Sequence, residues 1–273
     1  MADPSQPEAS GTGWYAFGVV RSRDAEPLPA NGLEAGRPPR AVVEGDVAAI
    51  VSQVDLDQFA EDRLADNLQD PDWLSARVRA HEDVLEELIR ERTVLPMRFG
   101  TIFRDLEGVS DLLLRGGKQL SAALASLAGS KEWGVRAALD RGRMDRWVSE
   151  RRPQPSGTPG GAEGTAYLGE RRAQRDLERE IERVTQDAER RAEAALRPVA
   201  RAVRRRGSSA TSETSWAVDL AVLVSEERLS ELRRVVDELA RSLEPRGLGF
   251  EITGPWPAYS FVNIELSQEV PAS

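Results

Sequence analysis

The 273-residue sequence predicts an α+β protein of two domains, an N-terminal mixed α/β domain and a C-terminal ferredoxin-like domain with a long helix and an aromatic C-terminal tail. The length exceeds the roughly 100 to 200 residues of a typical single domain. Segments with strand composition alternate with amphipathic helical patterns in both halves, and the second half has the ferredoxin-like order of strand, long helix, strand, helix, strand. We place the domains at 13–128 and 129–266, with disordered tails at 1–12 and 267–273.

The first domain begins with the strand 14–20, which is rich in aromatic and β-branched residues. Residues 40–44 and 47–54 predict two further strands, joined as a hairpin at Gly45 and Asp46. The turn signal is weak, because Glu-Gly-Asp is not the favoured order of turn residues.

A long amphipathic helix follows, with Asp70 as its N-cap and Pro71 at its first position, and runs to about Arg92. Its apolar stripe has spacings of three and four and consists of Leu74, Val78, His81, Leu85 and Leu88. His81 therefore faces the core, where a hydrogen-bonded structural role is favoured over that of a catalytic base.

Residues 93–103 predict a buried extended segment that is broken by Pro96 and Gly100. It is an edge strand or is bulged at Pro96, because Pro96 cannot donate a hydrogen bond to a neighbouring strand. Leu95, Met97 and Phe99 share one face of this strand, and Arg98 lies on the other. A charge in this position needs a partner or solvent. Arg98 either pairs with a carboxylate under the helix or is a docking residue beside a sheet edge.

The remaining elements follow in chain order: helices at 106–114 and 118–128 separated by Gly116-Gly117, a strand at 132–139, a mobile Pro/Gly/Ser-rich loop at 152–165, a helix at 167–206, a strand at 216–224, a helix capped by Ser225, and a strand at 248–253. Pro198 should kink or end the long helix. The basic cluster at its end (Arg201, Arg204, Arg205 and Arg206) is interpreted as cations that complement the helix dipole, in preference to a nucleic-acid contact.

The segment 254–262 places Trp256, Tyr259 and Phe261 within six positions. Pro255 and Pro257 hold it extended, which lowers the entropy lost on docking. The tail either folds back onto its own domain or offers an aromatic surface to a hydrophobic partner.

Composition disfavours most catalytic chemistries. The chain has no cysteine and a single histidine, so it lacks thiolate nucleophiles, cysteine zinc sites and multi-histidine metal centres. Gly117-Lys118 lacks the other residues of a phosphate-binding loop, and the sequence identifies no facing pair of carboxylates for acid–base catalysis. A net charge of −9 disfavours nucleic acid, and no apolar run is long enough to span a lipid membrane. We expect a cytoplasmic protein with no catalytic residue, cofactor, metal or small-molecule substrate.

Taken together, several segments resemble the GvpF/GvpL family of gas vesicle proteins. They occur in family order and are 14–20, 81–85, 94–103, 132–135, 166–168 and 254–261. The resemblance implies an accessory protein of gas vesicle formation, located at the gas vesicle, that has no enzymatic activity and associates with the small hydrophobic shell protein and other accessory proteins. It supplies no catalytic residues to carry over.

A shell that excludes water must be built from subunits with large apolar faces, which aggregate when exposed. We therefore expect an assembly factor with a chaperone-like role in nucleation or assembly. Its expected partner-binding residues are Leu95, Met97, Arg98, Phe99, Trp256, Tyr259 and Phe261. The alternatives are a minor structural component retained in the vesicle wall and a ferredoxin-like ligand-binding protein.

Overall fold

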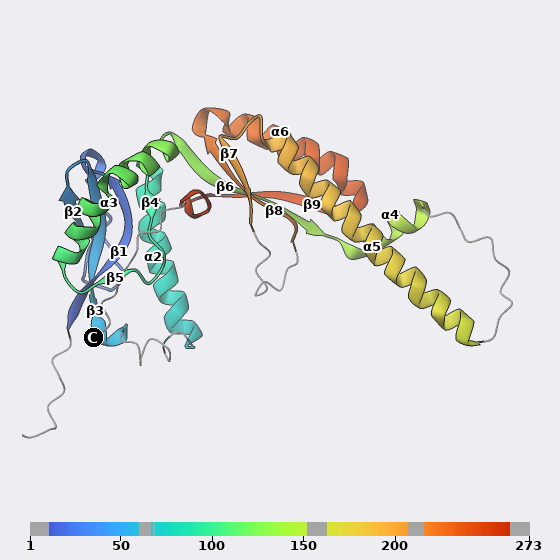
Figure 1. Ribbon diagram of the computed structural model, residues 1–273, viewed down its shortest axis with the longest axis horizontal. Helices are drawn as coiled ribbons and strands as arrows, with labels where there is room; N and C mark the ends of the chain where they lie inside the picture. The colour runs from blue at the N-terminus through green and yellow to red at the C-terminus, as the bar shows by residue number, and fades with distance from the viewer. Residues whose placement is uncertain (1–10, 60–66, 68, 152–162, 207–215, 263–273) are drawn as a thin grey trace, which may run out of the picture. The chain divides into compact units, whose positions relative to one another are not determined.

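The computed structural model describes residues 11–59, 67, 69–151, 163–206 and 216–262, without the side chains of 163–170 (Figure 1). Its contacts form two compact units. The first unit contains the chain up to Gly129 together with the segment from Pro257 onward, and the second unit is Ser130–Trp256. Residues 257–266 were expected in the second domain. That assignment is wrong for the described residues 257–262, which pack on the first unit.

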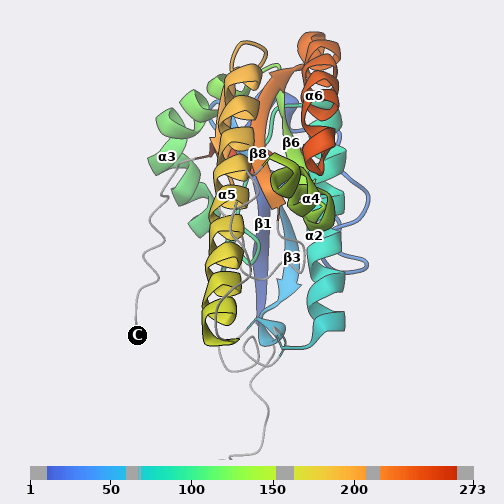
Figure 2. The same ribbon diagram turned by 90° about the vertical axis from the view of Figure 1, so that its right-hand side faces the viewer.

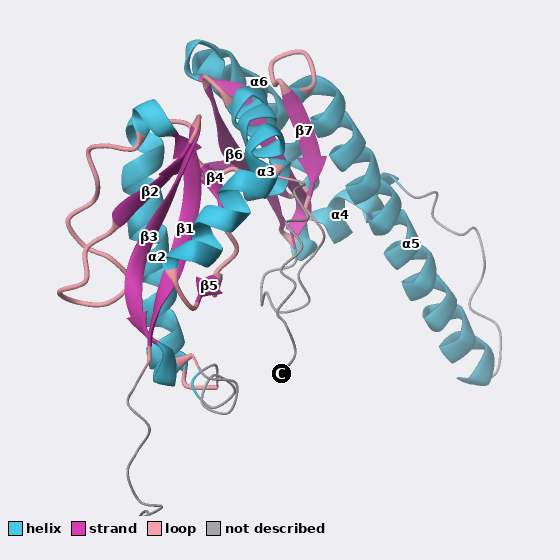
Figure 3. Ribbon diagram, turned by 60° about the vertical axis from the view of Figure 1, so that its left-hand side comes forward, coloured by secondary structure: helices cyan, strands magenta, loops and turns pink. Residues whose placement is uncertain are grey.

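The first unit contains an antiparallel sheet in the order β2-β3-β1-β4, with β5 also paired to β1 (Figure 3). Its strands are β1 (Thr12–Arg21), β2 (Arg40–Glu44), β3 (Val47–Asp55), β4 (Leu95–Pro96) and β5 (Ile102–Phe103). The predicted hairpin is confirmed, since Glu44 pairs with Val47 across a turn in which Gly45 has φ 56°. The expected edge position of the segment around Pro96 is also confirmed, because β4 ends the strand order.

Two helices cover opposite faces of this sheet: α2 (Pro71–Glu91) and α3 (Leu106–Leu127) (Figure 2). The N-cap of α2 is as predicted, because the Asp70 carboxylate accepts the backbone N–H groups of Asp72 and Trp73. The C-terminal half of α2 packs with alternate residues of β1 and β3 in one core. Short 3-10 helices lie at Ser22–Asp24 (η1), Leu56–Gln58 (η2) and Tyr259–Phe261 (η5).

The expected break at Gly116-Gly117 is wrong, because α3 is continuous through both glycines. Its buried stripe continues across them in helical register and consists of Val109, Leu113, Gly116, Leu120, Leu124 and Leu127. A glycine inside a helix costs about 1 kcal/mol relative to alanine. Burial of five large side chains on the same face outweighs that cost.

The second unit contains an antiparallel sheet in the order β7-β8-β6-β9. Its elements are β6 (Ser130–Leu139), α4 (Arg141–Arg151), α5 (Glu163–Leu196), β7 (Ala202–Arg205), β8 (Trp216–Ser225), η3 (Glu226–Arg228), α6 (Leu229–Leu243), η4 (Glu244–Arg246) and β9 (Leu248–Trp256). Alternate residues of the strands and the apolar stripes of α4, α5 and α6 share one core.

Three expectations for the second unit need correction. The long helix ends at Leu196, not near 206, because Pro198 follows, and the chain then forms β7. Ser225 precedes a 3-10 helix and makes no side-chain capping bond. α4 had no counterpart in the expected elements.

Of the loop expected at 152–165, residues 152–162 lie outside the described part, and α5 already begins at Glu163. The expected tails lie outside it too, except that β1 begins at Thr12.

Candidate functional site

His81 is the centre of a buried aromatic cluster in the first unit. Its side chain projects from α2 onto β1, and the residue is 1% exposed. The imidazole stacks on Phe17 with ring centroids 5.9 Å apart and meets the rings of Tyr15 and Phe99 edge-on at 5.6 and 5.7 Å. The expected position of His81 on the apolar face of the helix is confirmed.

Both imidazole nitrogens take part in a chain of hydrogen bonds. Nδ1 of His81 lies 2.9 Å from the Tyr15 hydroxyl, which also accepts the Gly100 N–H at 3.2 Å. Nε2 lies 2.7 Å from the Tyr259 hydroxyl, which donates to Glu82 Oε1 at 3.3 Å. Every donor finds an acceptor if the Tyr15 hydroxyl donates to Nδ1 and His81 carries its proton on Nε2. We assign that tautomer from the network.

The electrostatics keep this network neutral around His81. Burial lowers the pKa of His81 to about 4, so the imidazole is uncharged near neutral pH. Burial likewise raises the pKa of Tyr15 and of Tyr259 above the ordinary value, and both phenols stay protonated. The pKa of Glu82 is raised chiefly by burial; the hydrogen bond from Tyr259 opposes that shift and the charge of Glu86 adds to it. An imidazole with both nitrogens occupied and no exposed edge is a structural group.

The turn that supplies Gly100 is a hydrogen-bonded connection between β4 and β5. The N–H and the hydroxyl of Thr101 both donate to the Arg98 carbonyl, at 3.1 and 2.7 Å. Gly100 has φ 84°, in the left-handed region that favours glycine. The N–H of Met97 donates to Phe17 O at 2.9 Å, so the turn is fastened to β1. The extended segment expected at 93–103 is therefore two short strands separated by this turn.

The turn buries most of the docking residues expected on it. Leu95 and Met97 are buried, and Phe99 is half-buried against the core. Arg98 is exposed, and among the described residues it forms no ion pair with a carboxylate. Of the two expectations for Arg98, a surface position is the one observed.

The three aromatic residues of the tail are divided between the units. Trp256 ends β9 in the second unit, is 37% exposed, and donates its indole N–H to Thr253 Oγ1 at 3.1 Å. Tyr259 is 38% exposed although its hydroxyl is bound to His81, and Phe261 is half-buried. The structure brings Tyr259 and the turn at Gly100 to one network in the first unit.

A second polar cluster, missed by the sequence analysis, lies on the sheet of the second unit. The Glu132 side chain is almost fully buried and pairs with Arg206 at 2.5 Å. Gly134 leaves room for this pair and for Thr253, since a Cβ there would lie 2.5 Å from Thr253 Oγ1 and 3.3 Å from an Arg206 nitrogen. The sequence predicts the strand that carries Glu132 but not this ion pair, because one charge in a strand does not reveal its partner.

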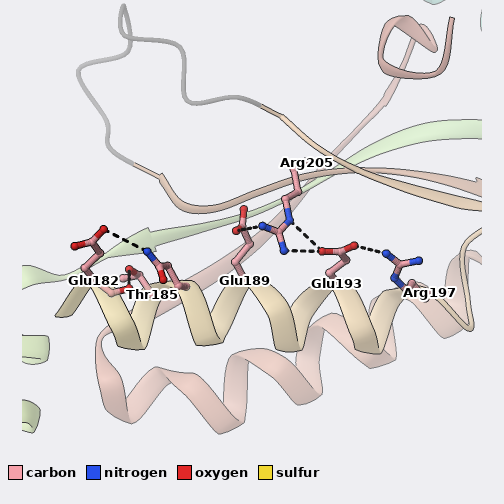
Figure 4. Close-up of polar contacts among 7 residues, drawn as sticks. Glu182, Thr185, Glu189, Glu193, Arg197 and Arg205 are labelled. Atoms are coloured by element: carbon pink, nitrogen blue, oxygen red, sulfur yellow. Dashed lines mark hydrogen bonds and ion pairs between the residues drawn. The ribbon is translucent and has the colours of Figure 1, made fainter. Parts of the chain in front are cut away.

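The basic cluster also differs from its expected role. Arg205 lies on β7 and reaches α5, where it pairs with Glu189 at 3.0 Å and Glu193 at 2.8 Å (Figure 4). Arg197, at the end of α5, pairs with the same Glu193. The hydrogen bond from Arg205, followed by that from Arg197, lowers the pKa of Glu193. Arg205 therefore joins a strand to a helix, in place of the helix-capping role expected for it.

Within the described residues, no cluster of three or more histidine or carboxylate side chains has the arrangement of a metal site. The helices described there are also too short or too polar to cross a membrane.

Comparison with known proteins places this chain in a family. Residues 13–263 match the family model described as gas vesicle synthesis protein GvpL/GvpF. The chain is 32% identical over 255 residues to gas vesicle protein L of Streptomyces sp. (strain CB03234), covering 92% of both chains. It is 30% identical over 259 residues to gas vesicle protein F of the same strain, covering 91% of this chain and 98% of the relative.

Two solved structures share the fold. The crystal structure of GvpF from Anabaena sp. PCC7120 matches with a TM-score of 0.67 and 20% identity, over 93% of this chain and 97% of that one. GvpF from Microcystis aeruginosa matches with a TM-score of 0.64 and 20% identity, over 92% and 99%. The resemblance noted in the sequence is confirmed: this chain belongs to the GvpL/GvpF family of gas vesicle proteins.

Proposed function

We propose that this chain assists nucleation or assembly of the gas vesicle by binding the small hydrophobic shell protein, at the vesicle and in the surrounding cytoplasm. Membership of the GvpL/GvpF family supports a part in gas vesicle formation. The observation that carries the binding role is that Trp256 and Tyr259 are each more than a third exposed while a hydrogen bond holds each polar group. An aromatic ring fixed at the surface loses little entropy when a partner covers it.

The expected contact residues divide by exposure into two groups. Arg98, Trp256 and Tyr259 are accessible and carry the proposed contact, and the half-buried Phe99 and Phe261 contribute their exposed parts. Leu95 and Met97 are buried, so their contribution is to hold the turn that presents Arg98. Other gas vesicle accessory proteins are further candidate partners.

The proposed role is non-catalytic. His81 is the single histidine of the chain, and both of its nitrogens already have hydrogen-bond partners inside the protein. A general base must reach a substrate proton, and this imidazole is 1% exposed. The burial of the best acid–base candidate supports a binding protein over an enzyme.

We also infer a ferredoxin-like arrangement for the second unit, with a domain boundary at Gly129. The strand order β7-β8-β6-β9 supports it, because the first and third strands of the unit lie at the centre and a helix follows each of them.

The binding role is tested by capture of the co-expressed shell protein on the immobilised chain. Trp256→Ala should reduce capture about tenfold, as expected for a partly exposed anchoring aromatic residue. Arg98→Glu should also reduce it, because it reverses the charge beside the β4 edge. Val78→Ala is the matched control, since Val78 is also 37% exposed but lies outside the proposed contact.

Capture that is unchanged by both Trp256→Ala and Arg98→Glu, in variants whose circular dichroism matches the parent, would remove these residues from the contact. No capture by the parent chain would contradict the shell protein as its partner.

A further inference from the structure

Residues 257–262 form a short docked segment that the structure attaches to the first unit. Pro257 and Ala258 are buried, and the N–H groups of Tyr259 and Phe261 donate to the carbonyls of Pro257 and Ala258. The segment is a single 3-10 turn and pairs with no described strand. The Tyr259 side chain fastens it to the first unit.

The Tyr259 hydroxyl binds between one donor and one acceptor, which together form its hydrogen-bonding pocket. The donor is Nε2–H of His81 at 2.7 Å, and the acceptor is the Glu82 carboxylate at 3.3 Å. A phenol satisfies both groups with one oxygen, because a hydroxyl accepts and donates at once. A phenylalanine ring of the same shape would leave a buried N–H without an acceptor, which is strongly unfavourable.

The residues around the pocket orient its N–H donor independently of Tyr259. Gly100 N–H occupies one side of the Tyr15 oxygen, so the Tyr15 proton points at Nδ1 and the His81 proton is held on Nε2. The imidazole plane is held by stacking on Phe17. The donor is thus oriented by groups in α2, β1 and the turn before β5, none of which belongs to the docked segment.

We propose that His81 and Glu82 form a tyrosine-recognition site, whose ligand is a tyrosine-bearing segment and whose resident occupant is the chain's own 257–262. The segment docks as a separable ligand and fastens the point at which the chain re-enters the first unit. This inference goes beyond the proposed binding of the shell protein and does not depend on it.

The test supplies the segment in trans to the full-length Tyr259→Ala variant, in which the pocket is vacated. The probe is the labelled peptide Pro-Ala-Tyr-Ser-Phe-Val, which copies 257–262, titrated to millimolar concentration and followed by NMR. We expect saturable binding, with at least tenfold weaker binding of the same peptide carrying Phe in place of Tyr. The parent chain, with its pocket filled, should bind the tyrosine peptide at least tenfold more weakly than the variant.

Adding His81→Phe to the variant should abolish the preference for the tyrosine peptide. Absence of saturable binding, or equal binding of the two peptides, would overturn the proposal. If Tyr259→Ala does not fold, hydrogen exchange of full-length Tyr259→Phe decides the matter. Exchange should rise at least tenfold across 257–262 and at the Gly100 amide, with Val78→Ala as control, and unchanged exchange would overturn the proposal.

Discussion

A single buried imidazole links the stability of this protein to pH. His81 has a pKa of about 4 in the folded chain, against an ordinary value near 6.5 for an unfolded one. Between these two values the unfolded chain binds the additional proton, so the free energy of unfolding falls as the pH is lowered through this window. Protonation would also place an N–H where the Tyr15 hydroxyl needs an acceptor.

Lowering the pH from 7 to 5 should therefore reduce the free energy of unfolding by about 2 kcal/mol through His81 alone. His81→Gln lacks the titrating group. The fall in its free energy of unfolding from pH 7 to pH 5 should therefore be about 2 kcal/mol smaller than that of the parent. Urea unfolding of both proteins at the two pH values measures the difference. Glu82 has a raised pKa, which acts in the opposite sense, but it is present in both proteins and cancels in the comparison.

The sequence placed His81 on the correct face of its helix because the apolar periodicity of α2 is local. Its hydrogen-bond partners could not be found in that way. Tyr259 is 178 positions away, and no periodicity relates two residues at that separation. Leu95 and Met97 were expected to contact a partner, but both are buried inside the protein, because both faces of the short strand segment are covered and alternation alone shows only one.

At the scale of elements, two glycines have opposite effects on the secondary structure. Gly100 makes a turn that only its left-handed backbone allows, whereas Gly117 lies inside α3 with no atom near its missing Cβ. The sequence correctly indicated an interruption at the first and incorrectly at the second, because a glycine pair weakens a helix without ending it.

The same substitution should therefore act in opposite directions at these two glycines. Gly117→Ala should raise the free energy of unfolding by about 0.5 to 1 kcal/mol, because alanine favours the helix and meets no neighbour. Gly100→Ala should lower it by about 1 to 2 kcal/mol through backbone strain, although its Cβ also meets nothing within 4 Å. Chemical denaturation of the two variants measures both changes in the free energy of unfolding. Two changes of the same sign would contradict the prediction.

The residues of β7 were expected to belong to the long helix, because the arginines of β7 continue the charge pattern of α5. Their position on a strand next to β8 depends on pairing with distant residues. One such pair, Glu132 with Arg206, joins β6 to the end of β7 and is largely shielded from water. A shielded charge that loses its partner is costly.

Glu132→Gln should lower the free energy of unfolding by about 3 kcal/mol, because it leaves the Arg206 charge without its carboxylate. Glu238→Gln is the matched control: its partner Arg234 lies one helical turn away and both side chains are more than half exposed, so the loss should stay below about 0.5 kcal/mol. Urea denaturation measures both. A loss for Glu132→Gln as small as that of the control would show that the pair contributes little.

At the scale of the whole molecule, four of the six segments that carry the family resemblance meet in one hydrogen-bond network. The segments at 14–20, 81–85, 94–103 and 254–261 supply Tyr15, His81, Gly100 and Tyr259 to one network. Composition and order predicted two α+β parts. They could not show that the last ordered segment belongs with the first part, since that depends on side-chain docking.

An assembly factor and a wall component differ in where the protein remains after assembly. If this chain acts as a transient partner of the shell protein, immunodetection should find it in cells forming vesicles and lose most of it when purified vesicles are washed. The shell protein serves as the loading control. Retention in constant ratio to the shell protein after washing would instead identify a component of the wall.

The return of the chain to its first unit at Pro257 has a consequence for biosynthesis. A ribosome releases β1, α2 and the turn at Gly100 well before it reaches Tyr259. Until that codon is translated and the nascent segment emerges, Nε2–H of His81 has water in place of its phenol. Completion of the network around His81 thus waits for the synthesis of Tyr259, 178 positions later in the chain, and a product terminated before Tyr259 would lack this hydroxyl.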